Sequence, residues 1–299
     1  MYDIIIVGAG PAGMTAAIYG SRAGKKVLVL EKKACGGQII NATKVKNYPG
    51  FLEISGLELS KNMRKQVESL GAEIKFEEVK KIVKGDKFKV KTDEGEYQAR
   101  AIILATGAES GRLGLPNEEK LTGRGVSYCA TCDGHFYKDK NVAVIGGGNT
   151  ALYDALYLSD IAKKVYLIHR RDEFRAEKAL VLQAEKKGNV EFVLGANITG
   201  FLSKDSMLTG VKLEKYGSEV LDLEISGVFV AIGYVPQNQV FSNVVLLDDK
   251  GYIETSDGVH TSTSKIYVAG DARKKDLKQL TTAVSDGAIA ASMAVKELD

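Results

Sequence analysis

Two stretches of hydrophobic residues, each ending at a glycine-rich turn, dominate the pattern of the chain. Residues 4–7 are apolar without interruption and lead into Gly8, and residues 142–145 repeat this arrangement before Gly146. Short continuous apolar runs are typical of strands that are covered on both faces of a parallel sheet. The pattern therefore predicts two buried strands, each at the start of its own structural unit.

The segments that follow each turn come in the same order. A helix comes first, then a second strand, then an excursion of short alternating strands that we expect to be antiparallel, and finally a buried strand. Two copies of one plan predict an internal duplication. The expected fold is α/β, with two Rossmann-like (three-layer ββα) nucleotide-binding domains and antiparallel β excursions. The predicted strands and excursions cover 26–30, 72–100 and 101–105 in the first copy, and 164–168, 190–224 and 228–231 in the second.

Two further elements lie outside the repeated plan. Apolar residues at three- and four-residue spacing predict an amphipathic helix over 56–70. A strand over 265–269 is followed by a long helix near the C-terminus, and no third glycine-rich turn precedes them. We therefore expect this last segment to fold back onto the first unit.

The two turns have the spacing of dinucleotide-binding fingerprints. The first is G-x-G-x-x-G and the second is G-x-G-x-x-A, and each lies between a predicted strand and a predicted helix. In this context the glycines allow a tight turn and close approach of the backbone to a pyrophosphate, which the helix N-terminus attracts. The residues concerned are Gly8, Gly10 and Gly13, and Gly146, Gly148 and Ala151.

The ends of the second strands differ between the two copies. Aligning Gly8 with Gly146 shifts one copy by 138 residues (146 minus 8), which places Glu31 opposite His169. An acid here accepts hydrogen bonds from ribose hydroxyls, whereas a basic cluster favours the 2′-phosphate of NADP. We therefore expect FAD or NAD in the first unit and NADPH in the second. The basic cluster consists of His169, Arg170, Arg171 and Arg175.

Composition and charge narrow the class of protein. The 299-residue chain has a net charge of +3, with its basic residues dispersed among acidic ones. That dispersion argues against nucleic-acid or membrane binding. A strand begins at Tyr2, so no signal peptide is expected. Together with only three cysteines, this favours the reducing environment of the cytoplasm.

Two of the three cysteines, Cys129 and Cys132, form a CxxC motif followed directly by Asp133. Three interpretations compete: half of a zinc site, a redox dithiol, or two unrelated thiols. A second close pair of Cys or His is missing from the sequence, so no metal site is expected. NADPH delivers two electrons as hydride and a disulfide takes up two electrons, and a flavin can link them. This chemistry favours a redox dithiol, with FAD in the first unit.

The sequence resembles the low-molecular-weight, bacterial-type thioredoxin reductases, which are class II pyridine nucleotide-disulfide oxidoreductases. CATCDG between two fingerprints is highly specific to that family, and the other motifs occur in family order along nearly the whole chain. These motifs are Gly8–Gly13, Gly36–Gln38, Asn47–Phe51, Ala105–Gly107, Cys129–Gly134, Gly146–Ala151, His169–Arg171 with Arg175, and Gly270–Asp271.

The resemblance implies an NADPH-dependent, FAD-containing enzyme that reduces thioredoxin, in the form of a cytoplasmic homodimer. The FAD domain would comprise 1–111 plus 242–299, and the NADPH domain, carrying the CxxC, would comprise 112–241. Cys129 and Cys132 would cycle between disulfide and dithiol, with Asp133 as proton donor or acceptor. Expected FAD-binding residues are Gly8, Gly10, Pro11, Ala12, Gly13, Glu31, Lys32, Gly36, Gly37, Gln38, Asn47, Gly107, Asp271, Lys278, Gln279 and Leu280. Expected NADPH-binding residues are Gly146, Gly148, Asn149, Thr150, Ala151, His169, Arg170, Arg171 and Arg175.

Two positions depart from the family pattern. Lys278 stands where the family usually has arginine, and Cys35 stands where a small or aliphatic residue is common. Lysine keeps the charge but lacks the forked donor geometry of arginine, while Cys35 is expected to be a packed free thiol. The rival functions are a reductase of another thioredoxin-like or glutaredoxin-like protein, a ferredoxin-fed or oxidase variant of the scaffold, and a non-enzymatic redox sensor.

Overall fold

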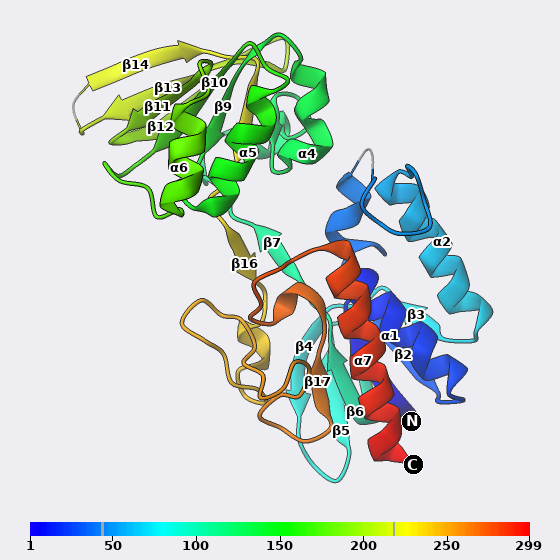
Figure 1. Cartoon of the computed structure of the whole chain (residues 1–299). Coiled ribbons are helices and arrows are strands. Elements are labelled where there is room, and N and C mark those ends of the chain that lie inside the picture. The colour runs from blue at the N-terminus through cyan, green and yellow to red at the C-terminus, as the bar shows by residue number, and fades with distance from the viewer. Residues whose placement is uncertain (43–44, 218) are drawn as a thin grey trace. The chain divides into compact units, whose positions relative to one another are not determined.

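The computed structural model describes residues 1–42, 45–217 and 219–299, and the chain divides into two compact units (Figure 1). The first unit comprises Met1–Glu109 and Val235–Asp299, and the second comprises Ser110–Tyr234. We had placed the boundaries after residues 111 and 241. Phe241, which that prediction assigns to the NADPH domain, is buried in the hydrophobic core of the first unit.

One seven-stranded sheet forms the centre of the first unit, in the order β3-β2-β1-β6-β5-β4, with β17 also paired to β6. Strand β6 is long enough to pair with both antiparallel and parallel neighbours. Its first half pairs antiparallel with β5, and its second half pairs parallel with β1 and β17. The strands are β1 (Tyr2–Val7), β2 (Val27–Leu30), β3 (Glu73–Lys75), β4 (Val79–Val83), β5 (Phe88–Thr92), β6 (Glu96–Leu104) and β17 (Ile266–Val268).

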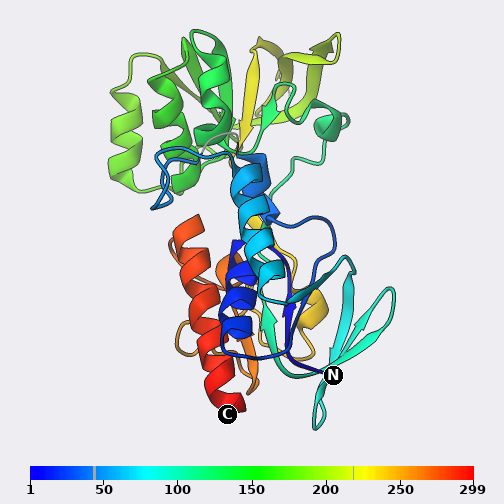
Figure 2. The same cartoon turned by 90° about the vertical axis from the view of Figure 1, so that its right-hand side faces the viewer.

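Helices α1 (Pro11–Arg22), α2 (Gly56–Ser69) and α7 (Leu280–Leu298) belong to the first unit, and α7 (red in Figure 2) lies beside α1 (blue). Small residues permit this close packing, because a Cβ at Gly287 of α7 would lie 2.1 Å from the carbonyl oxygen of Ala12. Since α7 and β17 both pack on elements of the first copy, the C-terminal segment completes the first unit, as its lack of a third fingerprint had suggested.

The second unit repeats the plan with a five-stranded parallel sheet in the order β11-β10-β9-β15-β8. The three strands between β11 and β15 form a separate antiparallel sheet, and β7 and β16, which carry the two passages of the chain between units, pair with each other. The strands are β7 (Ala108–Ser110), β8 (Val126–Ser127), β9 (Asn141–Ile145), β10 (Lys164–His169), β11 (Val190–Leu194), β12 (Ala196–Lys204), β13 (Met207–Lys215), β14 (Glu219–Glu224), β15 (Gly227–Val230) and β16 (Tyr234–Pro236). The helices are α3 (Glu118–Leu121), α4 (Ala130–Asp133), α5 (Asn149–Ser159) and α6 (Lys178–Glu185).

Alternation along β9 creates the three layers of the second unit. Val142 and Val144 join the core cluster that includes residues of α5 and α6, whereas Ala143 and Ile145 join the cluster that includes residues of β12 and β13. Successive side chains of a strand point to opposite faces, so a strand covered on both sides needs apolar residues throughout. The duplicated Rossmann-like α/β fold predicted from the sequence is thereby confirmed.

Two strands were misassigned in the prediction. Residues 73–75 and 190–194 were included in the antiparallel excursions, but β3 and β11 pair parallel with β2 and β10. Each follows a helix that crosses over the sheet, and so forms its third parallel strand. Within the described ranges, no helix has the length and apolar content needed to cross a membrane.

Candidate active site

The first glycine-rich turn is shaped by close backbone contacts. Gly8 has a φ of 104°, and a Cβ at Gly13 would lie 1.9 Å from the carbonyl oxygen of Gly8. By contrast, a Cβ at Gly10, the N-cap of α1, would meet nothing within 4 Å. Gly8 and Gly13 are therefore required for the turn itself, and Gly10 leaves space in front of the free N–H groups of α1.

The carboxylate of Glu31, at the end of β2, is fixed by backbone donors. The Ala9 N–H donates to Oε2 at 2.7 Å and the Lys33 N–H donates to Oε1 at 2.9 Å. A cavity of about 390 Å³ opens beside it. The cavity combines this acid with apolar walls, which suits a nucleoside. Its lining includes Val7, Gly8, Leu30, Glu31, Lys32, Val79, Thr106, Val240 and Phe241.

Several other predicted FAD residues lie against the first turn. The Gly36 N–H donates to the Ala9 carbonyl oxygen at 2.7 Å, and Gly36 has a φ of 114°. The Gln38 amide donates to the carbonyl oxygen of Ala108 at 2.7 Å, next to Gly107. Segments 36–38 and 107–108 are thus brought to the fingerprint by backbone and amide hydrogen bonds.

The start of α7 is attached to the loop that carries Asn47. The Asn47 amide donates to the Gln279 side chain at 3.1 Å, and Gln279 forms a capping box with Thr282. Lys278 places its ammonium 3.5 Å from the centre of the Tyr252 ring, and burial lowers its pKa. A cation over an aromatic ring is a favourable arrangement. The lysine that replaces the family's arginine is therefore held by Tyr252.

Asp271 belongs to a buried network of charges. The Lys275 ammonium lies 3.3 Å from Asp271 Oδ1 and 3.1 Å from Asp286 Oδ2, and Arg273 also pairs with Asp286. Asp271 Oδ1 is buried and forms this ion pair with Lys275, but accepts no hydrogen bond from the residues that the structure describes. Since buried polar atoms are normally hydrogen-bonded, this oxygen fits a role as acceptor for a hydroxyl of a bound cofactor.

In the second unit, close backbone contacts also shape the glycine-rich turn at Gly146–Ala151. Gly146 has a φ of 153°, and a Cβ there would lie 2.3 Å from the Ala231 carbonyl oxygen, whereas a Cβ at Gly148 would meet nothing within 4 Å. Asn149, the first residue of α5, exchanges hydrogen bonds with Glu177 at 2.8 and 2.9 Å. The space in front of α5 again fits a pyrophosphate.

The basic cluster differs from its prediction in one respect. His169 is 5% exposed, and burial together with the charges of Arg175, Arg171 and Arg170 lowers its pKa. We had counted His169 among the positive groups, but it is uncharged at neutral pH because a buried imidazolium beside three guanidinium groups is disfavoured. Its Nε2 is buried without a hydrogen-bond partner in the described part of the chain. The positive charge therefore comes from the three arginines, which are exposed.

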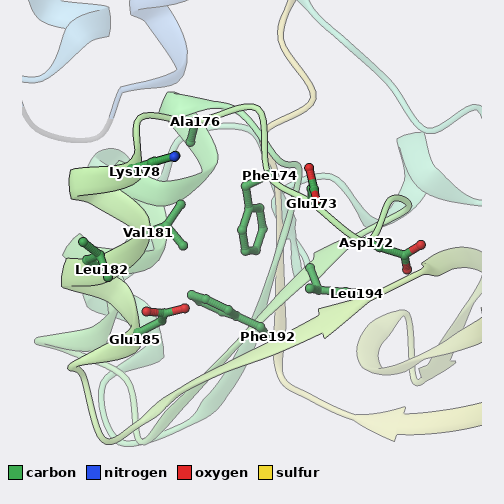
Figure 3. Close-up of a pocket in the computed structure, with 10 residues that line it drawn as sticks. All are labelled: Asp172, Glu173, Phe174, Ala176, Lys178, Val181, Leu182, Glu185, Phe192 and Leu194. Carbon is green, nitrogen blue, oxygen red and sulfur yellow. The ribbon is translucent and has the colours of Figure 1, made fainter.

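The loop after His169 borders a groove of about 370 Å³. Figure 3 shows Phe174 from this loop and Phe192 from β11 pointing into the groove opposite side chains of α6. The His169 ring stacks on Phe174, with centroids 5.6 Å apart and planes inclined by 16°. Phe174, which lines the groove, therefore packs against one face of the His169 ring. None of the residues that line the groove comes from the glycine-rich turn.

The CxxC motif occupies the segment after β8. Cys129 is the N-cap of α4, and Cys129 and Cys132 are joined in a disulfide. The Asp133 N–H donates to the Cys129 carbonyl oxygen at 3.1 Å, so the carboxylate-bearing residue stays with the disulfide. The hydroxyl of Thr131 lies 3.5 Å from Cys129 Sγ. Of the three interpretations of the CxxC, a redox-active pair fits this geometry.

The sequence profile described as pyridine nucleotide-disulphide oxidoreductase matches residues 2–287. The chain belongs to that family. It is 43% identical to the thioredoxin reductase of Listeria monocytogenes, over 100% of this chain and 94% of the relative. The solved thioredoxin reductase of Streptococcus pyogenes is 41% identical, with a TM-score of 0.84 over 100% of this chain and 98% of that one. Within its family the chain is therefore an oxidoreductase of the bacterial thioredoxin reductase type.

Sequence reasoning missed several polar residues that support the site in this disulfide oxidoreductase. Ser127 binds Asp133, with Oγ 2.6 Å from Oδ2. Glu118, 4% exposed, accepts hydrogen bonds from the Leu113 and Gly114 N–H groups and from the hydroxyl of Tyr128, which precedes Cys129.

In the first unit of the oxidoreductase, fully buried Asn238 accepts from Thr106 and donates to the carbonyl oxygen of Ala272. Asn238 therefore links the cavity wall to the segment after Asp271. Like Ser127 and Glu118, it has no motif that distinguishes it from other polar residues of the sequence.

Proposed function

We propose that this chain is an NADPH-dependent, FAD-containing thioredoxin-disulfide reductase. The observation that carries the proposal is the contrast between the two nucleotide sites, together with the disulfide in the second unit. Glu31 ends the second strand of one site, and arginines follow the second strand of the other, while Cys129 and Cys132 form the disulfide. Such a chain has one site for a nucleotide whose ribose carries no 2′-phosphate and a second site for a nucleotide that carries this phosphate. Its disulfide can accept two electrons.

The residues of the first unit would hold FAD. The N–H groups at the start of α1 would bind the pyrophosphate, Glu31 the adenosine ribose, and Asp271 Oδ1 a hydroxyl of the cofactor. Gln279 and Leu280 would bring the N-terminus of α7 to the ring system, where its positive dipole end favours negative charge. When bound, FAD supplies a carrier of two electrons between the nicotinamide and the disulfide.

In the second unit, the turn at Gly146–Ala151 would bind the NADPH pyrophosphate, and Arg170, Arg171 and Arg175 the 2′-phosphate. His169 would contribute a neutral Nε2 as a hydrogen-bonding atom. The overall reaction balances as NADPH, one proton and one disulfide giving NADP⁺ and two thiols. Asp133, which follows Cys132 directly, would donate or accept the proton that accompanies this change at the dithiol.

The dithiol would then reduce thioredoxin by exchange. One thiolate attacks the substrate disulfide to form a mixed disulfide, and the second thiol displaces the reduced substrate, so that the Cys129–Cys132 disulfide returns. Thioredoxin has a reduction potential of about −270 mV, so an enzyme disulfide about 30 mV more oxidising would lose about 1.4 kcal/mol of driving force. We further propose that the enzyme is a cytoplasmic homodimer.

An anaerobic titration tests this function. The purified protein should be yellow, and NADPH should bleach its flavin at far lower concentration than NADH, after which oxidised thioredoxin should restore the colour. A Cys132→Ser variant should still be bleached but should not reduce thioredoxin, while Cys35→Ser, a change at the free thiol, should behave as the parent. Bleaching by reduced ferredoxin and not by NADPH would contradict the proposal, as would disulfide reduction by Cys132→Ser.

A further inference from the structure

We propose that Ser127 is a positioning residue that holds the Asp133 carboxylate beside the redox-active disulfide, an inference that rests on the proposed function. The Ser127 hydroxyl oxygen lies 2.6 Å from Asp133 Oδ2 and 3.1 Å from the backbone nitrogen of Cys129. One side chain therefore contacts both the carboxylate that follows the second cysteine and the backbone of the first.

The direction of each hydrogen bond follows from the donor inventory. A serine hydroxyl carries one proton and two lone pairs. The Cys129 N–H can only donate, so it takes one lone pair of Oγ. The single proton could go to Asp133 Oδ2 at 2.6 Å or to the Cys129 carbonyl oxygen at 3.3 Å. Hydrogen bonds between two oxygens are usually about 2.5–3.0 Å long, so the proton is directed to Asp133.

Ser127 is itself rigidly placed. It is the last residue of β8, pairs with Phe229 in the parallel sheet, and is only 3% exposed. Asp133, by contrast, ends a helix of four residues, and a fragment this short has little stability of its own. Strand β8 therefore fixes the position of Ser127, and the hydrogen bond from the Ser127 hydroxyl fixes the position of the Asp133 carboxylate.

Two sets of hydrogen bonds connect Asp133 to Cys129. The backbone N–H of Asp133 donates to the carbonyl oxygen of Cys129, and its carboxylate accepts from Ser127, which in turn accepts from the Cys129 N–H. Opening the disulfide lets the two cysteines separate. With the Ser127 hydrogen bond in place, the carboxylate keeps its position relative to the backbone of Cys129; without that bond, the side chain is free to turn to solvent.

The test compares two substitutions of equal shape. Ser127→Thr keeps the hydroxyl and Ser127→Val replaces it with a methyl group, so any strain from the added methyl group is shared. With oxidised thioredoxin as substrate, we expect kcat of Ser127→Thr within about threefold of the parent and kcat of Ser127→Val lower than Ser127→Thr by about tenfold or more, as for loss of a hydrogen bond to a charged group. KM and the rate of flavin bleaching by NADPH should match in the two variants.

A double-substitution cycle separates positioning from a structural effect. If Ser127 acts through Asp133, then adding Ser127→Ala to Asp133→Asn should slow turnover no further, whereas additive losses would overturn the proposal. Ser159→Ala, which removes a buried hydroxyl bonded to the Leu156 carbonyl oxygen at 2.6 Å, is the control for stability. Equal kcat values for Ser127→Thr and Ser127→Val would also overturn it, and a parent enzyme without disulfide turnover would instead contradict the proposed function.

Discussion

The ring of His169 lies directly against Gly147. A Cβ at Gly147 would be 2.2 Å from Cε1 of the imidazole, closer than any real contact allows. The same glycine accepts a hydrogen bond from the Arg175 N–H, at 2.7 Å from nitrogen to its carbonyl oxygen. The glycine-rich turn and the arginine-bearing loop are therefore packed as one piece, although 22 residues (169 minus 147) separate Gly147 from His169 in the sequence.

A Gly147→Ala substitution should therefore damage NADPH binding without touching the arginines. The new methyl group has to displace His169, and the loop from Arg170 to Arg175 moves with it. We expect the Kd for NADP⁺, which binds without reducing the flavin, to rise by about tenfold or more when measured by isothermal titration calorimetry. Gly188→Ala is the control, because a Cβ at Gly188 would meet nothing within 4 Å. An unchanged Kd in Gly147→Ala would show that the turn and the loop are independent.

Replacement of the arginines should change the choice of nucleotide. Arg170 and Arg171 are exposed, and together with Arg175 they supply the positive charge of the cluster, because His169 is uncharged. The double variant with Gln at 170 and 171 should lose about 30- to 25,000-fold in kcat/KM for NADPH, at about 1–3 kcal/mol for each of the two charge-assisted contacts. Its kcat/KM for NADH should stay within about threefold. Lys204→Gln, an exposed change elsewhere in the second unit, should alter neither value.

Asp154 on α5 should make the stability of the protein depend on pH. Burial raises the pKa of this carboxyl from 3.8 to about 7. Because the folded protein binds this proton more tightly than the unfolded chain, the free energy of unfolding falls as pH rises from about 4 to about 7 and stays at the lower value above pH 7. The full loss is up to about 4 kcal/mol.

The Asp154→Asn variant should therefore unfold at a higher temperature than the parent at pH 8 and at nearly the same temperature at pH 4. Thermal unfolding followed by circular dichroism at the two pH values measures this difference. Asp205→Asn, an exposed substitution between β12 and β13, should change neither midpoint by a comparable amount. A parent and an Asp154→Asn variant with parallel pH profiles would refute the effect of burial.

Glu118 should be essential for the local structure that precedes the disulfide. Its carboxylate accepts from two backbone N–H groups at 2.9 and 2.8 Å and from the Tyr128 hydroxyl at 2.7 Å. Burial, together with this bond to Glu118, raises the pKa of Tyr128 to about 12. Glu118→Ala leaves the donors without an acceptor and should lower the free energy of unfolding by about 3 kcal/mol or more.

The neighbouring residue gives a matched control. Glu119 is exposed on the same short helix, and Glu119→Ala should change the free energy of unfolding by no more than about 0.5 kcal/mol. Urea titrations of both variants provide the measurement. Equal losses of stability in the two variants would mean that the buried carboxylate contributes no more than an exposed one.

The sequence by itself determined the duplicated fold, the two fingerprint turns and the CxxC. These features are encoded locally: a buried strand, a glycine turn and a helix N-terminus follow one another within about 30 residues, and their periods of 2 and 3.6 can be read directly. The difference between Glu31 and the arginines was visible for the same reason, since each lies at a fixed distance from its own fingerprint.

Only the tertiary structure decided the properties that depend on neighbours. Runs as short as 73–75 and 190–194 carry the same alternation whether their partner strand is parallel or antiparallel. His169 stays uncharged because it is buried against Gly147 beside arginines, and burial raises the pKa of Asp154 to about 7. The Ser127 hydroxyl can donate a hydrogen bond to Asp133 because the backbone between the two residues turns back on itself. Charge state and hydrogen-bond partner follow from solvation and approach in space, which residue spacing does not specify.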